Sequence, residues 1–146
     1  MIDIRPLRDE DHDLAARIWL HGWHSTGLAV SRDTVLAQLC ERIPRESAIG
    51  WDAYLAWRGD EAVGFLALKL KLCCLDQLFL VPQAQRKGIG RALFEFACVR
   101  MPDGFWLRTA VENAGACGFY EHLGCRRGEV QRHPTLGHMT VIYRWP

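Results

Sequence analysis

A phosphate-binding pattern occupies residues 85–91, where an apolar segment gives way to helical spacing. The residues are Gln85, Arg86, Lys87, Gly88, Ile89, Gly90 and Arg91. The first amide groups of a helix have no internal acceptor, and the helix dipole adds partial positive charge at the same end. Glycine has no Cβ, so phosphate oxygens can approach the backbone. The pattern predicts a pyrophosphate site, and an ordinary turn with a solvated basic rim is the alternative.

Two common nucleotide-binding motifs are absent from the chain. A P-loop requires Gly-x-x-x-x-Gly-Lys followed by Ser or Thr, and no segment has this sequence. A dinucleotide fingerprint requires a third glycine three residues after Gly90, where Leu93 stands instead. A nucleotide-binding domain of either class is therefore not expected.

Two flanking stretches make the pattern more specific. Residues 78–82 read Leu-Phe-Leu-Val-Pro, and residues 85–90 follow as Gln-x-x-Gly-x-Gly. Downstream, residues 113–124 read Asn-x-x-Ala-x-x-Phe-Tyr-x-x-x-Gly. In this order the two motifs resemble those of the GCN5-related N-acetyltransferase (GNAT) superfamily, except that Cys125 replaces the family's final aromatic residue.

The resemblance implies that the chain uses acetyl-CoA as co-substrate. The pantetheine arm would lie along the strand that ends at Val81, and a backbone N–H near Leu80 or Val81 would polarise the thioester carbonyl. The loop amides of residues 86–91 would hold the pyrophosphate. The expected cofactor contacts are Phe79, Leu80, Val81, Gln85, Arg86, Lys87, Gly88, Ile89, Gly90, Arg91, Asn113, Ala116, Phe119 and Tyr120.

Tyr120 matches the family tyrosine proposed as general acid for the departing CoA thiolate. A nearby O–H donor stabilises such a leaving group. The alternative is that Tyr120 only packs, with its hydroxyl hydrogen-bonded to the cofactor. Asn113 matches a residue whose amide contacts the cofactor arm, and it is also suited to cap the helix that follows. Phe119 is expected to pack.

The attacking amine must first lose a proton, because an ammonium has a pKa of about 10. Asp76, at the start of the apolar strand, and Glu112, beside Asn113, are the candidate bases. A water chain is the alternative for both, and the competing interpretation of Asp76, which the sequence favours, is a solvated carboxylate at a strand end.

The acceptor is expected between the first two helices and the last hairpin, as in the family. Trp19, Trp23 and His24 are the candidate substrate contacts, and they suit an apolar or aromatic amine. The alternative is core packing for Trp19 and a surface position for the histidines. His21 and His24 stand three residues apart, but two histidines make a weak metal signal, so no metal is expected.

Length and composition indicate one soluble domain over residues 1–146, with 49% apolar and 24% charged residues. The net charge of +1 gives no broad basic field for nucleic acid. Neither a signal-peptide core nor an apolar run of about 18 residues is present, so a cytoplasmic protein without membrane contact is expected. Because the chain is not small, its six cysteines are expected to be reduced.

Hydrophobic periodicity predicts an α/β (α+β) domain around a mixed sheet. Strands are expected at residues 2–6, 51–57, 62–72, 73–81, 105–111, 124–131 and 138–145. Helices are expected from Asp9 or Asp11 to about Gly22, from Ser31 to Pro44, and over residues 87–100 and 114–122. The apolar strand before Pro82 is expected to be buried on both faces. With the family resemblance, this gives a mostly antiparallel sheet of six to seven strands, splayed at its central strands, with about four helices.

The leading hypothesis is an N-acetyltransferase that acts on a primary amine of a small molecule or a protein by direct attack in a ternary complex. The alternative is a catalytically silent acyl-CoA-binding sensor or regulatory module. Family members are often homodimers, so a homodimer is a further expectation. The sequence leaves the amine acceptor open.

Overall fold

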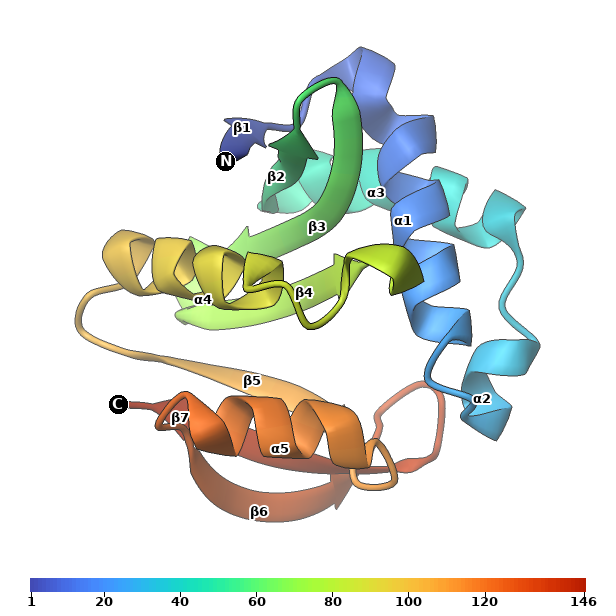
Figure 1. Cartoon of the computed structure of the whole chain (residues 1–146). Helices are drawn as coiled ribbons and strands as arrows, with labels where there is room; N and C mark the ends of the chain where they lie inside the picture. The colour runs from blue at the N-terminus through green and yellow to red at the C-terminus, as the bar shows by residue number, and fades with distance from the viewer.

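Seven strands form one open sheet in the computed structural model, which describes residues 1–146 (Figure 1). They are β1 (Ile2–Pro6), β2 (Asp52–Arg58), β3 (Glu61–Lys69), β4 (Cys74–Leu80), β5 (Phe105–Ala110), β6 (Arg126–Arg132) and β7 (Met139–Trp145). The order across the sheet is β1-β2-β3-β4-β5-β7-β6. Only β4 and β5 pair in parallel, so the predicted mixed, mostly antiparallel sheet is confirmed.

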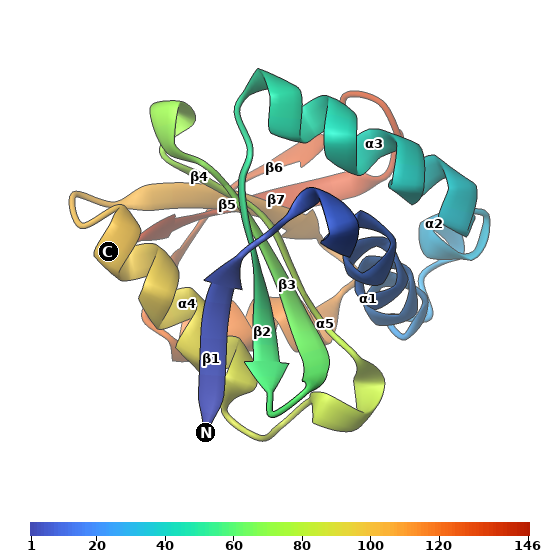
Figure 2. The same ribbon diagram turned by 90° about the horizontal axis from the view of Figure 1, so that it is seen from above.

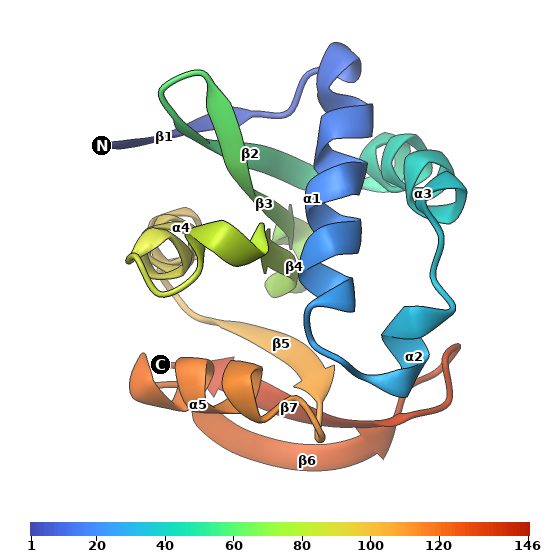
Figure 3. The same cartoon turned by 45° about the vertical axis from the view of Figure 1, so that its right-hand side comes forward.

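The chain has five α-helices, four of which cover the two faces of this sheet. They are α1 (His12–His24), α2 (Ala29–Arg32), α3 (Leu36–Ile49), α4 (Ile89–Arg100) and α5 (Ala114–His122). The helices α1 and α3 lie on one face, and α4 and α5 lie on the other (Figure 2, Figure 3). None of these helices combines the length and the apolar character needed to cross a membrane.

The helix expected from Ser31 to Pro44 is wrong at both ends. Ser31 belongs to the separate helix α2, and α3 starts at Leu36 and continues through Pro44 to Ile49. Pro44 leaves the carbonyl four residues earlier without its usual donor. Its ring is exposed, so that end of the turn faces solvent and the helix continues.

The second strand of the first hairpin also ends earlier than expected. It stops at Lys69, and residues 70–72 form a 3₁₀ turn that closes at Cys73 in the left-handed conformation, with φ of 49°. The sharp turn delivers the chain into β4 beside β3.

The expectation that β4 is buried on both faces is wrong for most of its length. Cys74 and Leu75 are buried, whereas the remainder of the strand to Leu80 is only half-buried. β4 and β5 share a single paired position, Cys74 with Trp106, and then diverge. The apolar residues of β4 therefore border an opening in the sheet.

Helix α1 lies directly on the end of β4. A Cβ atom at Gly22 would stand 2.9 Å from the Leu80 carbonyl oxygen and 3.0 Å from the Phe79 Cβ. Trp19, one turn earlier, is 4% exposed, and its ring stacks on those of Phe65 and Phe79. A small residue at position 22 therefore allows the helix to approach the strand closely.

Candidate active site

A cleft of about 660 Å³ occupies the opening between β4 and β5. It passes from one face of the sheet to the other, since α1 and α3 line one side and α5 lines the other. Trp19, Trp23 and Arg42 belong to the first side, and Ala116 and Tyr120 to the second. The loop between β6 and β7 closes the cleft with residues 133–136 and His138.

The edge of β4 that faces away from β3 carries a free backbone amide. Val81 N donates to Val63 O at 3.0 Å, so this pair bonds across β3 and β4. Antiparallel partners alternate between bonded and non-bonded pairs. The next pair, Leu80 with Gly64, is therefore non-bonded, and the Leu80 N–H points away from β3. Of the two expected amides, Val81 is engaged within the sheet and Leu80 is free.

A β-bulge sets the position of Asp76. Ala67 pairs with Gln77 and Leu68 pairs with Leu75, which leaves Asp76 without a partner. Its carboxylate accepts a hydrogen bond from Trp51 Nε1 at 2.8 Å and lies 3.8 Å from Lys69 Nζ. Asp76 lines the cleft, and these two contacts hold its carboxylate against Trp51 and Lys69.

The other candidate base, Glu112, lies outside the cleft. Its side chain is exposed in the turn between β5 and α5. Its negative charge acts on His138, whose pKa is lowered by burial and raised in part by Glu112. This position gives Glu112 no direct approach to an amine in the cleft.

Tyr120 brings a protonated hydroxyl to the α5 side of the cleft. The residue is 7% exposed, and its ring packs against Phe94, Phe119 and Tyr143. Burial, and then the charge of Cys125, raise the Tyr120 pKa well above its ordinary value of 10. Tyr120 lines the cleft, and no hydrogen bond from a protein group contributes to the shift of its pKa. The Tyr120 hydroxyl is therefore a proton donor.

Three hydrogen-bonded side chains support the ring on which Tyr120 packs. Tyr143 is fully buried, its hydroxyl donates to a Glu121 carboxylate oxygen, and Arg127 Nη1 donates to the same hydroxyl at 3.1 Å. The Tyr143 ring lies 6.2 Å from the Tyr120 ring. These contacts fix the wall against which Tyr120 packs.

The glycine loop lies at the same end of β4, but at the surface rather than in the cleft. Arg86 and Gly88 both have positive φ, 62° and 81°, and Gly88 is the residue before α4. Arg86, Lys87 and Arg91 are exposed. Gly90 allows α4 to pack closely against the Phe119 ring, because a Cβ at position 90 would stand 3.3 Å from that ring. None of Leu80, Val81, Phe119 or residues 85–91 lines the cleft.

Asn113 and Ala116 lie where the cleft meets the start of α5. Asn113 Oδ1 accepts from Ala116 N at 3.1 Å, which confirms that Asn113 caps this helix. Both residues also line the cleft, as does Phe79 on the opposite strand. These three residues, with Tyr120, are the expected cofactor contacts that the fold brings together in the cleft.

The expected substrate residues divide between the cleft and the surface. Trp19 and Trp23 line the cleft, where the Trp23 ring meets Phe79 edge-on and Trp23 Nε1 donates to Thr34 Oγ1 at 3.2 Å. His24 is exposed, its Nε2 lies 2.9 Å from Thr34 O, and it does not line the cleft. No group of three or more His, Cys, Asp or Glu side chains is arranged to hold a metal ion.

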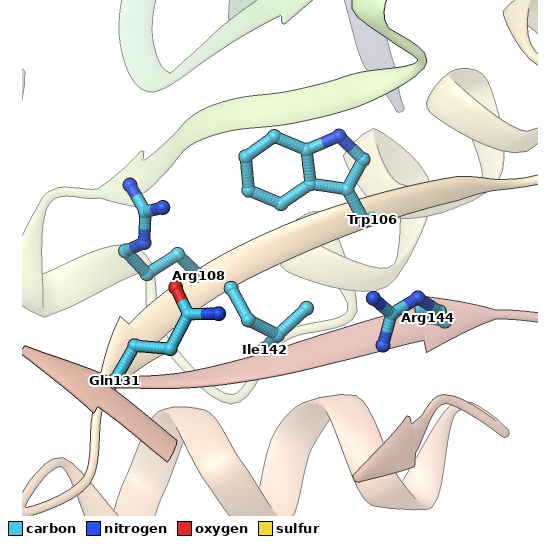
Figure 4. Close-up of a pocket in the computed structure, with 5 residues that line it drawn as sticks. All are labelled: Trp106, Arg108, Gln131, Ile142 and Arg144. Atoms are coloured by element: carbon cyan, nitrogen blue, oxygen red, sulfur yellow. The ribbon is translucent and has the colours of Figure 1, made fainter. Parts of the chain in front are cut away.

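Sequence reasoning missed the basic residues of the cleft, Arg42, Arg45, Lys69 and Arg108. Arg42 and Arg45 come from α3, whereas Arg108 comes from β5. Figure 4 shows Arg108 and Trp106 projecting together from β5, beside a shallow hollow of about 250 Å³ that shares both residues with the cleft. No local motif marks these positions, because only the sheet brings them together.

Comparisons with known proteins agree with this architecture. Residues 9–125 match the sequence model of the acetyltransferase (GNAT) family. The chain belongs to this family. The acetyltransferase is 31% identical over 126 residues to the peptidyl-lysine N-acetyltransferase YjaB of Salmonella typhimurium, covering 85% of this chain and 83% of that protein.

Solved structures share the fold of the acetyltransferase. An acetyltransferase from Thermus thermophilus has a TM-score of 0.83 at 21% identity, covering 100% of this chain and 97% of that one. The PaiA N-acetyltransferase of Thermoplasma acidophilum, solved in complex with coenzyme A, has a TM-score of 0.73 at 21% identity and covers 99% of both chains.

Proposed function

We propose that this acetyltransferase moves the acetyl group of acetyl-CoA to a primary amine by direct attack in a ternary complex, with Tyr120 as general acid. The observation that carries the proposal is the Tyr120 hydroxyl, whose raised pKa keeps it protonated and whose pKa shift includes no hydrogen bond to a protein group. It belongs to the cleft that β4 and β5 open through the sheet. Both reactants can therefore enter from opposite faces and meet between the strands.

The co-substrate would lie along β4, as the family resemblance implies. The acetyl thioester carbonyl would accept a hydrogen bond from the free N–H of Leu80, which stabilises negative charge on that oxygen. Asn113 and Ala116 would contact the arm from α5. The exposed amides and cations of residues 86–91 would hold the pyrophosphate at the start of α4. The structure of PaiA with coenzyme A supports this choice of co-substrate.

The chemical step is a substitution at the thioester carbon. The neutral amine attacks that carbon and a C–N bond forms, while the carbonyl oxygen gains negative charge. The C–S bond then breaks, and the CoA thiolate takes the proton of the Tyr120 hydroxyl. The amine releases its own proton to water in the cleft, which Asp76 also lines, and a proton from water restores the Tyr120 hydroxyl.

A lysine side chain is one acceptor that the comparisons suggest. The curated relative is named for peptidyl-lysine acetylation, and a lysine amine is a primary amine of the required kind. Residues of α1 and α3 line one side of the cleft, and the amine of a flexible side chain or of a small molecule would enter on that side.

Amine-dependent release of CoA thiol from acetyl-CoA tests this function. We expect Tyr120→Phe to lower kcat about a hundredfold, in the range of a lost general acid, while acetyl-CoA binds with nearly unchanged Kd. Tyr54→Phe is the matched control, because the Tyr54 hydroxyl donates to Asp52 at 2.7 Å on β2, away from the cleft. Unchanged turnover in Tyr120→Phe would remove the acid role. Acetyl-CoA binding without thiol release with any amine would indicate a sensor.

A further inference from the structure

The α3 side of the cleft carries an excess of positive charge. Its basic lining residues are Arg42, Arg45, Lys69 and Arg108, and its acidic lining residues are Glu41 and Asp76. The ammonium of Lys69 is compensated, because it lies 3.7 Å from Glu46 Oε2 and 3.8 Å from Asp76 Oδ2. The arginines have no such partners, so the remaining charge of this part of the cleft is carried by them.

Aromatic rings, rather than carboxylates, hold two of these arginines. The Arg42 guanidinium lies 5.2 Å from the centre of the Trp19 ring, and the Arg108 guanidinium lies 5.5 Å from that of Trp106. Neither arginine forms a salt bridge, and Arg108 Nε is buried without a hydrogen-bond partner. A buried donor without an acceptor is costly, and an incoming acceptor group relieves that cost. Glu41 is exposed on α3 and does not neutralise Arg42 or Arg108 by an ion pair.

His133 adds a neutral donor beside these guanidinium groups. Its Nδ1 accepts hydrogen bonds from Leu136 N at 3.0 Å and Thr135 N at 3.2 Å. A backbone N–H can only donate, so the proton of the neutral ring is on Nε2. Burial, and then the charges of His138, Arg108 and Arg42, lower the His133 pKa, which keeps the ring neutral. His133 therefore acts as an N–H donor in the cleft and not as a base.

Apolar rings from α1 and β4 line the same cleft as these donors. Trp23 and Phe79 pack edge-on with ring centres 6.1 Å apart, and Trp19 stacks on Phe79. All three line the cleft together with the arginines. A bound molecule would therefore contact an apolar wall and, next to it, hydrogen-bond donors that suit an anion.

Resting on the proposed function, we propose that the amine acceptor carries a carboxylate, which Arg42, Arg108 and His133 bind. Guanidinium groups suit this role because their paired N–H donors match the two carboxylate oxygens. The carboxylate would anchor the acceptor at the α3 side of the cleft, and the amine would face the opening between β4 and β5. The carboxylate belongs either to a free amino acid or to an acidic residue beside the reactive lysine of a peptide.

Matched acceptors test the proposal by thiol release. Each free L-amino acid is compared with its carboxamide, which has the same size and no negative charge. We expect kcat/KM to be about tenfold or more higher for the carboxylate, the effect of one charge-assisted hydrogen bond. The amine of the carboxamide is less basic and more often neutral, so this comparison is biased against the proposal. Lysine peptides with Glu or Gln beside the lysine distinguish the peptide source from the free amino acid.

Charge variants assign the preference to the named residues. In Arg108→Gln, and separately in Arg42→Gln, the ratio of kcat/KM for carboxylate over carboxamide should fall about tenfold. Arg58→Gln removes the same charge at the β2–β3 turn, where Arg58 pairs with Glu61 at 3.6 Å, and should leave the ratio unchanged. Melting temperatures confirm that each variant is folded.

The outcomes separate this inference from the proposed function. Amine acetylation with no preference for the carboxylate, or a ratio that both arginine variants leave unchanged, overturns the inference alone. A chain that releases no thiol with any acceptor overturns the proposed function and the inference with it. A preference seen only with acidic peptides supports the inference and assigns the carboxylate to a peptide.

Discussion

Gly22 offers the sharpest test of how α1 and β4 position the cleft. The residue lies within α1, where alanine is the better helix former by about 1 kcal/mol. In Gly22→Ala, however, the new Cβ would stand 2.9 Å from the Leu80 carbonyl oxygen and 3.0 Å from Phe79 Cβ. The first neighbour is backbone, so rotation of a side chain cannot relieve the contact.

The gain in helix propensity and the steric contact of the new Cβ have opposite effects on stability, and the steric contact has the larger effect. Overpacking of a well-packed site costs about 1–3 kcal/mol, and a backbone neighbour favours the upper end of that range. Subtraction of the gain in helix propensity leaves a loss of about 2 kcal/mol in the free energy of unfolding. For a domain of this size, that loss lowers Tm by about 4–8 °C.

Gly118→Ala is the matched control for this change. Gly118 lies within α5, and a Cβ there meets nothing within 4 Å. The same substitution should therefore stabilise the protein by about 0.5–1 kcal/mol. Urea denaturation and thermal melting of both variants measure the two effects.

Opposite signs for the two alanine variants are the expected result. The Gly22 variant should also bind acetyl-CoA more weakly, because displacement of the Leu80 backbone moves the edge along which the co-substrate lies. A Gly22→Ala protein that is as stable as the Gly118→Ala protein would refute the close packing of α1 on β4.

Further predictions concern pH and thiol reactivity. Burial lowers the pKa of His133 and His138 below the ordinary 6.5, so the unfolded chain binds protons more readily, and the free energy of unfolding should decrease as pH falls below about 6.5. Urea denaturation across that range should show a smaller decrease in His133→Gln, and an unchanged decrease would contradict the depressed pKa. The exposed thiol of Cys73 should react rapidly with a thiol reagent. Burial raises the pKa of the neighbouring Cys74 thiol to about 12, so Cys74 should stay unmodified. Labelling of Cys74 in the folded protein would contradict its buried position.

The sequence predicted a helix boundary well where a capping residue marks it. The helix expected over residues 114–122 is observed as α5, because Asn113 caps its start through Ala116 N. The boundary at Pro44 was wrong, because an exposed proline can be accommodated where its missing hydrogen bond faces solvent.

The candidate site was only partly predictable for a different reason. Tyr120, Asn113 and Ala116 lie on one short helix, so a linear motif contains them. The half-burial of β4 follows from its divergence from β5, which depends on pairing between residues far apart in the chain. Arg42 lies on α3, Arg108 on β5 and His133 in the loop between β6 and β7, and no sequence spacing relates them.

Hydrogen exchange at the Leu80 amide tests the central claim, that acetyl-CoA binds along the free edge of β4. Val81 is the internal control, because its N–H donates to Val63 O at 3.0 Å. Without ligand, the Leu80 amide should exchange much faster than the Val81 amide, and saturating acetyl-CoA should slow Leu80 while Val81 changes little. A Leu80 amide that is already protected without ligand, or one that acetyl-CoA leaves unaffected, would contradict the account.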